Sequence, residues 1–309
     1  MKSVLITGGA GFIGSHIAEK LVDSDCEVRI IDNLSTGSLS NLKKIESKIQ
    51  FEKQDIRDID KLIEFSKNCD TIFHEAAVVS VPTTIKDPLG STMINDIGTL
   101  NVFEAARVNN IKRVVFASSC AIYGDRPQLP KKEDMKPFPQ SPYSVQKITG
   151  EYYAKIYHEL YNIETVCLRY FNVYGPKQDP SSPYSGVISI FLKKALNNEQ
   201  PTIFGDGRQY RDFIYVQDVV NANILAATTD GIGGTVFNIG TGNFVRINTV
   251  WKKICQLLNL NIEPKYAPKR PGDIIESVSN IDHAQKYLSF KPKFFFDEGL
   301  YKTLDWFNI

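Results

Sequence analysis

The sequence predicts a doubly wound α/β fold, in which helices cover both faces of a parallel sheet and a smaller cap domain is interleaved with it. Three observations predict this class. Short β-branched runs alternate with longer helical patterns in the first half of the chain. A glycine-rich turn follows the first such run and opens the first helical pattern. Beyond residue 171, prolines and glycines divide the chain into shorter elements.

The strands are expected where a few consecutive residues are apolar and β-branched, as in a sheet buried on both faces. They fall at residues 4–7, 28–31, around 51, 71–74, 113–117 and 165–168. Apolar residues at helical spacing predict a helix through Ile17 and Leu21, then longer ones at 95–108 and 143–160. In the second half, helices are expected at 187–196, 218–227, 250–258 and near 298–307. We therefore expect residues 1–170 to form the sheet domain, with 215–235 returning to it, and 171–309 to form mainly the cap.

Composition excludes several classes of protein. The 36 Lys and Arg residues almost equal the 35 Asp and Glu residues, so no overall field favours nucleic acid or an anionic membrane. No apolar run approaches the roughly 18 residues of a membrane span. The 5 cysteines and 4 histidines are scattered, which predicts reduced thiols, a cytoplasmic location and no metal site.

The glycine-rich turn has the spacing G-x-x-G-x-x-G, with Phe12 and Ile13 between its last two glycines. Gly8 allows the tight turn, Gly11 lets the backbone approach a pyrophosphate, and Gly14 lets the helix pack closely on the strand. The free N–H groups at the start of the helix then bind phosphate oxygens. The turn therefore predicts a dinucleotide site.

Acidic residues follow the next two strands. Asp32 ends the second strand, where its carboxylate can accept hydrogen bonds from both hydroxyls of the adenosine ribose and would repel a 2′-phosphate. This favours NAD over NADP. Asp55 and Ile56 follow the third strand and are expected at the adenine edge, although an ordinary loop aspartate is an open alternative.

Tyr143 and Lys147 stand at i and i+4 of a predicted helix, so they share one face. A phenol is a poor base at neutral pH, but a neighbouring ammonium and a positive nicotinamide ring would lower its pKa. Ser119 ends the fifth strand, at the sheet edge that faces the ligand. Together they predict a base, its cationic partner and a hydroxyl that binds the oxygen being oxidised.

On these residues the chain resembles the extended short-chain dehydrogenase/reductase family, and within it the nucleotide-sugar 4-epimerases. The resemblance covers essentially the whole chain and implies a Rossmann-like sheet. Further motifs that carry it are His74-Glu75-Ala76-Ala77, Asn95 with Gly98-Thr99, Ser118 to Gly124, Arg169 to Asn172, Gly205-Asp206-Gly207, Arg211-Asp212-Phe213 and Arg270 to Asp273. The resemblance adds Asn33, Ala76 and Asn95 to the residues expected to bind NAD.

The resemblance also implies a nucleotide-sugar site in the cap. It assigns Asn172, Arg211 and Arg270 to the nucleotide diphosphate, Asp273 to the uridine ribose, and Val187 to the substrate pocket. Arginine suits such a role because its planar fork binds two phosphate oxygens. Surface ion pairs are the alternative for the two arginines.

The expected reaction is NAD-dependent 4-epimerisation of a UDP-hexose. Dehydratases that resemble this chain carry an Asp-Glu pair after the hydroxyl residue, whereas Cys120 and Ala121 follow Ser119 here. Ser277 matches a position at which related epimerases use a bulky tyrosine to exclude N-acetyl groups. A serine there predicts UDP-GlcNAc and UDP-GalNAc as substrates, alongside UDP-Glc and UDP-Gal. Cys120 itself is expected to be a buried bystander.

Other readings stay open. One is a UDP-glucuronate 4-epimerase or decarboxylase, which would need a cation placed for the C6 carboxylate. Another is a non-catalytic NAD-binding regulatory protein, although such proteins typically lose the Tyr143–Lys147 pair. Helices 95–108 and 143–160 carry apolar residues on more than one face. Since relatives dimerise through this pair, we expect a homodimer with a four-helix bundle; burial inside the monomer is the alternative.

Overall fold

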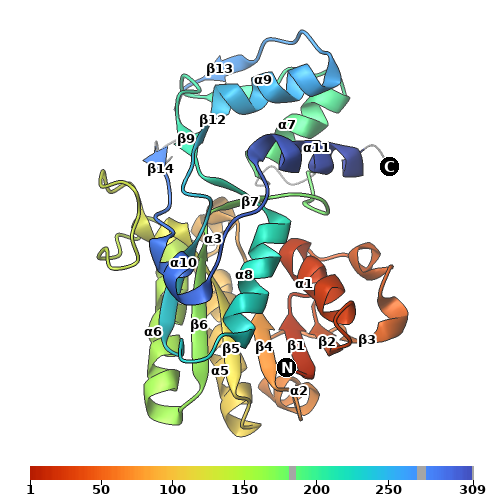
Figure 1. The fold of residues 1–309 in the computed structure, drawn as a ribbon, viewed down its shortest axis with the longest axis vertical. Coiled ribbons are helices and arrows are strands. Elements are labelled where there is room, and N and C mark those ends of the chain that lie inside the picture. The colour runs from red at the N-terminus through yellow and green to blue at the C-terminus, as the bar shows by residue number, and fades with distance from the viewer. Residues whose placement is uncertain (181–185, 270–275, 308–309) are drawn as a thin grey trace.

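A seven-stranded sheet forms the centre of the computed structural model, which describes residues 1–180, 186–269 and 276–307. Its strand order is β11-β6-β5-β4-β1-β2-β3 (Figure 1). All neighbouring strands of this sheet run parallel. The strands are β1 (Ser3–Thr7), β2 (Glu27–Ile31), β3 (Ile49–Glu52), β4 (Thr71–His74), β5 (Arg113–Ser119), β6 (Glu164–Tyr170) and β11 (Thr235–Ile239).

Helices cover both faces of this sheet. The first face packs against α1 (Phe12–Val22), α8 (Val216–Thr228) and α10 (Asp282–Leu288). The second packs against α2 (Ile59–Phe65), α5 (Thr99–Val108) and α6 (Pro142–Tyr161). Alternate strand residues supply the two cores: Val4 and Ile6 belong to the first, and Leu5 to the second. The predicted doubly wound fold is confirmed.

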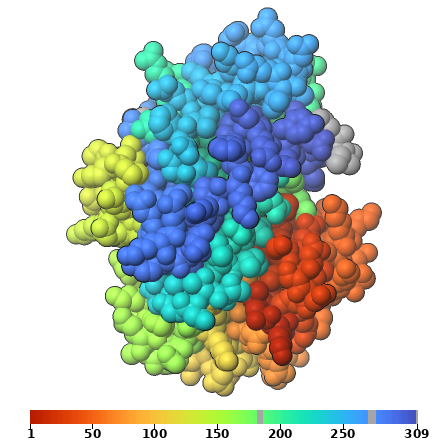
Figure 2. Space-filling view, viewed as in Figure 1, coloured from red at the N-terminus to blue at the C-terminus, as the bar shows by residue number. Residues whose placement is uncertain are grey.

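The cap has its own apolar core and lies above the sheet in Figure 1. Its helices are α7 (Val187–Leu196), α9 (Ile247–Leu258) and α11 (Phe296–Phe307). Small sheets pair β7 (Asn172–Tyr174) with β10 (Phe213–Tyr215), and β8 (Thr202–Phe204) with β13 (Lys265–Ala267). A third joins β9 (Tyr210–Arg211), β12 (Val245–Arg246) and β14 (Glu276–Ser277). In the space-filling view the C-terminal residues lie on both levels, because α11 belongs to the cap and α10 packs beside α8 (Figure 2).

Several short elements have no counterpart in the sequence prediction. The expected helix at 95–108 is preceded by α3 (Val81–Lys86) and α4 (Pro88–Thr92), and it begins as a π-helical segment, η3 (Met93–Gly98). Single 3₁₀ turns lie at η1 (Leu39–Leu42), η2 (Glu46–Lys48) and η4 (Cys120–Tyr123). The cap strands of two or three residues are too short to show a period-2 pattern.

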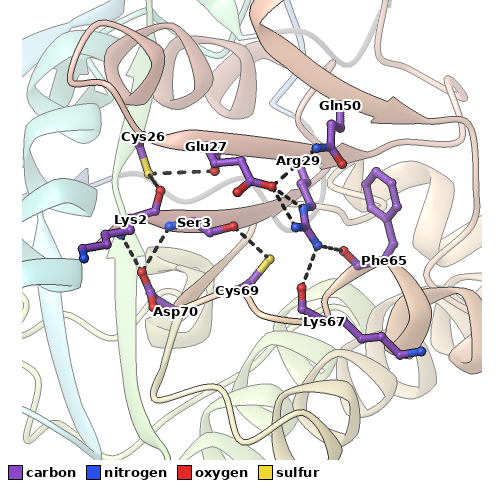
Figure 3. A network of polar contacts seen from close by, with 10 residues as sticks. All are labelled: Lys2, Ser3, Cys26, Glu27, Arg29, Gln50, Phe65, Lys67, Cys69 and Asp70. Carbon is purple, nitrogen blue, oxygen red and sulfur yellow. Dashed lines mark hydrogen bonds and ion pairs between the residues drawn. The ribbon is translucent and has the colours of Figure 1, made fainter.

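Polar contacts fix the edge of the sheet opposite the cap (Figure 3). The backbone N–H groups of Lys2 and Ser3 donate to Asp70 Oδ2, at 2.5 and 3.1 Å. Arg29 of β2 donates to the carbonyls of Phe65 and Lys67, at 3.2 and 2.7 Å. These contacts bind the turn before β4 to β1 and β2. In doubly wound folds, ligands bind at the opposite edge of the sheet, where the strands have their carboxyl ends.

Within the described ranges, no helix is both long enough and apolar enough to cross a membrane. The same residues contain no cluster of His, Cys, Asp and Glu that could hold a metal ion. All five cysteines are free thiols.

Candidate active site

The glycine turn between β1 and α1 is shaped for close approach. Gly8 has a φ of +71°, and a Cβ built on it would lie 2.7 Å from the backbone nitrogen of Ala76. A Cβ on Gly14 would lie 2.4 Å from the Gly8 carbonyl oxygen. Gly11 is the N-cap of α1 and offers no side-chain cap, so the amides at the start of the helix, including those of Phe12 and Ile13, are available to phosphate oxygens. The turn fits a dinucleotide pyrophosphate.

Asp32 holds this turn from the end of β2. Its Oδ2 accepts from the Ala10 N–H at 2.9 Å, and its Oδ1 accepts from the Leu34 N–H at 2.8 Å. Burial raises the pKa of the carboxyl, and the two hydrogen bonds oppose that rise. Each oxygen keeps a lone pair for another donor. A Cβ on Gly37 would lie 2.9 Å from both oxygens. The absence of a side chain at Gly37 therefore leaves room for the carboxylate.

Asn33 and Asp55 meet beside Asp32, but they are bound mainly to each other and to Arg57. Asn33 Nδ2 donates to Asp55 Oδ2 at 2.9 Å. Arg57 forms a bidentate pair with the same carboxylate, with both contacts at 2.9 Å, and these bonds lower the pKa of Asp55 to about 2. Ile56 is buried and lies under Gly98. Contact of these residues with adenine stays a prediction.

Tyr143, Lys147 and Ser119 meet at the carboxyl edge of the sheet. The first two stand on successive turns of α6, and both are buried. Lys147 Nζ donates to the Ala117 carbonyl at 2.7 Å and lies 5.8 Å from the centroid of the Tyr143 ring. Ser119 ends β5, and its hydroxyl is close enough to Tyr143 to lower the pKa of that phenol. The structure thus brings together the three residues expected to be catalytic.

The pKa of Tyr143 depends on the groups that surround the phenol. In the protein alone, burial raises it to about 12, and the nearby Ser119 hydroxyl only partly opposes this rise. The expected lowering by Lys147 together with a nicotinamide ring stays a prediction. Burial also lowers the pKa of Lys147 to about 8, and its ammonium is directed to a backbone carbonyl. Further positive charge near the phenol, such as a nicotinamide ring, is needed to favour the phenolate.

Asn95 and Ala76 border the path between the glycine turn and Tyr143. Asn95 is buried, exchanges hydrogen bonds with the backbone of Val78 at 2.8 and 2.9 Å, and donates to Gln146 of α6 at 2.7 Å. It therefore fixes the loop after β4 against α6. Ala76 contributes backbone packed against Gly8. The roles of both residues in binding NAD remain predictions.

Strand β14 of the cap brings Ser277 to the catalytic residues. Ser277 is 6% exposed, pairs in register with Arg211 of β9, and lies close enough to the thiol of Cys120 to lower its pKa. Burial raises the pKa of that thiol to about 12, while the charge of Arg211 lowers it. Cys120 is therefore a thiol at neutral pH. Cys120 is half-buried, not fully buried as expected, and its lack of a catalytic role stays a prediction.

The other predicted substrate residues are placed less fully. Asn172 Nδ2 donates to the Asp212 carbonyl at 3.0 Å, across the β7–β10 pair. Val187 is half-buried at the start of α7. Arg270 and Asp273 lie outside the described residues.

Comparison with known proteins identifies the family. Residues 4–240 match the NAD dependent epimerase/dehydratase family. The chain belongs to this family. A UDP-glucose 4-epimerase of Mycolicibacterium smegmatis is 38% identical over 310 residues, which cover 98% of each protein. The predictions of an enzyme of this family and of NAD as its cofactor are confirmed.

Solved structures agree over the full chain. One is a UDP-N-acetylglucosamine 4-epimerase from Methanobrevibacter ruminantium in complex with UDP-N-acetylmuramic acid. It is 44% identical, with a TM-score of 0.96 and coverage of 99% of this chain and 98% of that one. Another is a UDP-glucose 4-epimerase from Thermotoga maritima with UDP-glucose. It is 37% identical, with a TM-score of 0.95 and the same coverage.

Two features of the site were not predicted. Asp212 is fully buried and accepts hydrogen bonds from Thr241, Gly242 and Ser279, which ties the residue between β9 and β10 to the segments after β11 and β14. It was present in the Arg211-Asp212-Phe213 motif, but only the arginine received a role. Glu75 is the second feature, and its carboxyl group lies among the catalytic residues.

Proposed function

We propose that this chain is a nucleotide-sugar 4-epimerase, an isomerase that inverts C4 of UDP-hexoses. We assign it UDP-GlcNAc and UDP-GalNAc, and also UDP-Glc and UDP-Gal, as substrates. The observation that carries the proposal is the convergence of Tyr143, Lys147 and Ser119 at the sheet edge, next to a cap strand that contributes Ser277. A non-catalytic NAD-binding protein would not need these side chains together.

The mechanism divides the chemistry between cofactor and chain. NAD, held by the glycine turn and Asp32, supplies when bound the ability to take a hydride from C4 of the sugar and to return it. Tyr143 accepts the proton of the 4-hydroxyl, and Ser119 hydrogen-bonds the same oxygen. Lys147 adds positive charge beside the phenol and can donate to the nicotinamide ribose. The 4-keto sugar would turn over in the pocket, so that the hydride returns to the opposite face of C4 while Tyr143 returns the proton to the C4 oxygen.

The residues after Ser119 argue against a dehydratase. Elimination needs an acid and a base close to the hydroxyl residue. Cys120 stands there with a thiol whose pKa burial raises to about 12, and Ala121 carries no titratable group. Neither residue can exchange a proton with the sugar at neutral pH, so return of the hydride is the outcome that these side chains support.

Acceptance of N-acetylated sugars depends on Ser277. Its side chain contacts Cys120, which follows the catalytic Ser119, so a larger residue would enter the same space. We expect Ser277→Tyr to lower kcat/KM for UDP-GlcNAc more than tenfold relative to UDP-Glc. Thr202→Tyr, on an exposed position of strand β8, is the matched control. Equal losses on both sugars would remove Ser277 from the specificity pocket.

UDP-glucuronate is the second candidate substrate, because one buried cation lies near the site. Lys131 is 1% exposed and donates to the Arg126 carbonyl, and its ammonium is close enough to Cys120 for their charges to interact. If it binds a C6 carboxylate, Lys131→Met will abolish turnover of UDP-glucuronate and spare UDP-Glc. Lys132→Met, at an exposed neighbour, is the control. Loss of CO₂ would indicate a decarboxylase.

We also propose a homodimer built on a four-helix bundle. Segment 88–108 and α6 pack side by side, and each carries a row of exposed apolar side chains. The exposed residues are Leu89, Met93, Ile97 and Val108 on the first, and Val145, Tyr152, Ile156 and Leu160 on the second. A second copy would cover both rows. Leu89→Glu with Ile156→Glu should give monomers in light scattering, whereas Leu39→Glu, exposed on η1, should not.

The division of labour between domains is part of the same proposal. Residues 1–170, with 215–235, would bind NAD, and 171–309 would mainly bind the UDP-sugar. α8 and β11 lie against the main sheet, which supports a return of the chain to the NAD domain before it re-enters the cap. The cytoplasmic location also remains a proposal, supported by the free thiols.

A further inference from the structure

Glu75 is a carboxyl group inside the active site to which the mechanism above assigns no task. It directly follows β4, and its backbone packs with Ala76 against Gly8, where the glycine turn approaches the cofactor. A Cβ on Gly8 would lie 3.0 Å from the Glu75 carbonyl carbon. Glu75 therefore stands between the pyrophosphate end of the dinucleotide site and the catalytic residues of α6.

One uncharged partner, Tyr170, binds its side chain, and Asn223 in turn holds Tyr170. The Tyr170 hydroxyl donates to Glu75 Oε1 at 2.8 Å and accepts from Asn223 Nδ2 at 2.8 Å. Tyr170 ends β6 and pairs in register with Ser119 on β5, and Asn223 is fully buried on α8. Three segments thus hold the carboxyl group in one place. They are the residue after β4, the end of β6 and the middle of α8.

Lys147 of the catalytic pair is anchored beside Glu75, because its Nζ donates to the carbonyl of Ala117, the residue after Phe116, and Phe116 pairs in register with His74. Lys147 lowers the pKa of Glu75, although burial dominates and raises it to about 7. In return, Glu75 raises the pKa of Lys147 and that of Tyr143. On β4 itself, His74 is neutral, because burial lowers its pKa to about 3. The charges of Asp96 and Glu151 also raise the pKa of Lys147, but a substitution at position 75 leaves both residues in place.

We propose that Glu75 is a positioning residue whose carboxyl group, held by Tyr170, sets the pH range in which Tyr143 is a phenolate and Lys147 an ammonium. An ionised Glu75 repels the phenolate and stabilises the ammonium. A neutral group at this position removes both the repulsion and the stabilisation. Removal of the charge should therefore move both limbs of the pH profile in one direction, to lower pH.

The test is Glu75→Gln in the NAD-loaded enzyme, since glutamine keeps an acceptor for Tyr170 and loses the charge. Both limbs of the kcat profile for UDP-Glc should fall by roughly 1 to 2 pH units, the size expected for one charge about 6 to 12 Å away at an effective dielectric near 20. Glu64→Gln, exposed on α2 and paired with Lys61, is the control and should leave the profile unchanged.

A second readout does not need turnover. Ultraviolet difference titration of each NAD-loaded protein against its Tyr143→Phe version isolates the ionisation of this one phenol. Tyr143 should ionise at lower pH in Glu75→Gln than in the wild type. Tyr170→Phe should give a smaller shift of the same sign, because loss of its hydrogen bond favours the neutral form of Glu75. The Tyr170→Phe variant also tests the inference if Glu75→Gln does not fold.

The kinetic arm rests on the proposed epimerase function, whereas the titration does not. Absence of UDP-hexose turnover in the wild type, with a shifted Tyr143 titration in Glu75→Gln, would contradict the proposed function and retain the role of Glu75. An unchanged Tyr143 titration, with or without a fall in kcat, would overturn the inference and leave Glu75 a structural residue.

Discussion

Tyr143→Phe is the substitution with the sharpest consequence, because it removes a single oxygen. In the structure Ser119 is close enough to that oxygen to lower the pKa of the phenol, and Tyr143 is 9% exposed. Phenylalanine fills the same space, so the fold loses at most one hydrogen bond, with a net value of about 1 kcal/mol. Catalysis loses its acid–base group, which is worth about 10² to 10⁴ in rate, or roughly 3 to 5 kcal/mol of transition-state stabilisation.

The assay follows interconversion of UDP-Glc and UDP-Gal by chromatography, with NAD content measured in parallel. We expect kcat to fall at least a hundredfold while bound NAD and the unfolding temperature stay near the wild-type values. Tyr152→Phe, on an exposed position of the same helix, should retain full activity. Turnover of the Tyr143→Phe enzyme within tenfold of the wild type would refute the assignment of this phenol as the base.

Three further substitutions test other parts of the account. Ser119→Ala removes a donor that lowers the pKa of Tyr143, so the acid limb of the kcat profile should move to higher pH; an unmoved limb would exclude this role. Gly14→Ala places a Cβ 2.4 Å from the Gly8 carbonyl oxygen, so NAD affinity by calorimetry should fall more than tenfold, and unchanged affinity would contradict the predicted close packing. Glu151→Gln leaves Arg169 without its buried partner at 2.7 Å. Denaturant unfolding should show a loss of about 3 to 5 kcal/mol, and a loss below 1 kcal/mol would mean that the pair is not buried in solution.

Local chemistry explains why the sheet and the catalytic residues were predictable. Val4 and Ile6 pack into one apolar core and Leu5 packs into the other. A strand that contributes to both cores needs consecutive apolar residues, and the sequence shows them directly. Tyr143 and Lys147 share a helix face by spacing alone. The glycine turn is likewise a local feature, since Gly8 requires its positive φ and Gly14 its close contact within one short segment.

Contacts between distant segments were not predictable in the same way. The proximity of Cys120 to Ser277 and the hydrogen bond between Tyr170 and Glu75 depend on how the cap and the strand ends meet. The pKa of Tyr143 depends on burial, which spacing does not reveal. For the same reason, Asp212 looked like one acidic residue in a motif, although it joins several segments of the fold.

Transfer of deuterium tests the central claim most directly. UDP-Glc labelled with deuterium at C4 is incubated with the purified NAD-containing enzyme, without added NAD, and the UDP-Gal formed is examined by mass spectrometry and NMR. Return of the hydride within one active site predicts that the label stays at C4 of the product, with no exchange into solvent. Loss of the label to water, or a stoichiometric build-up of NADH without UDP-Gal, would contradict the account.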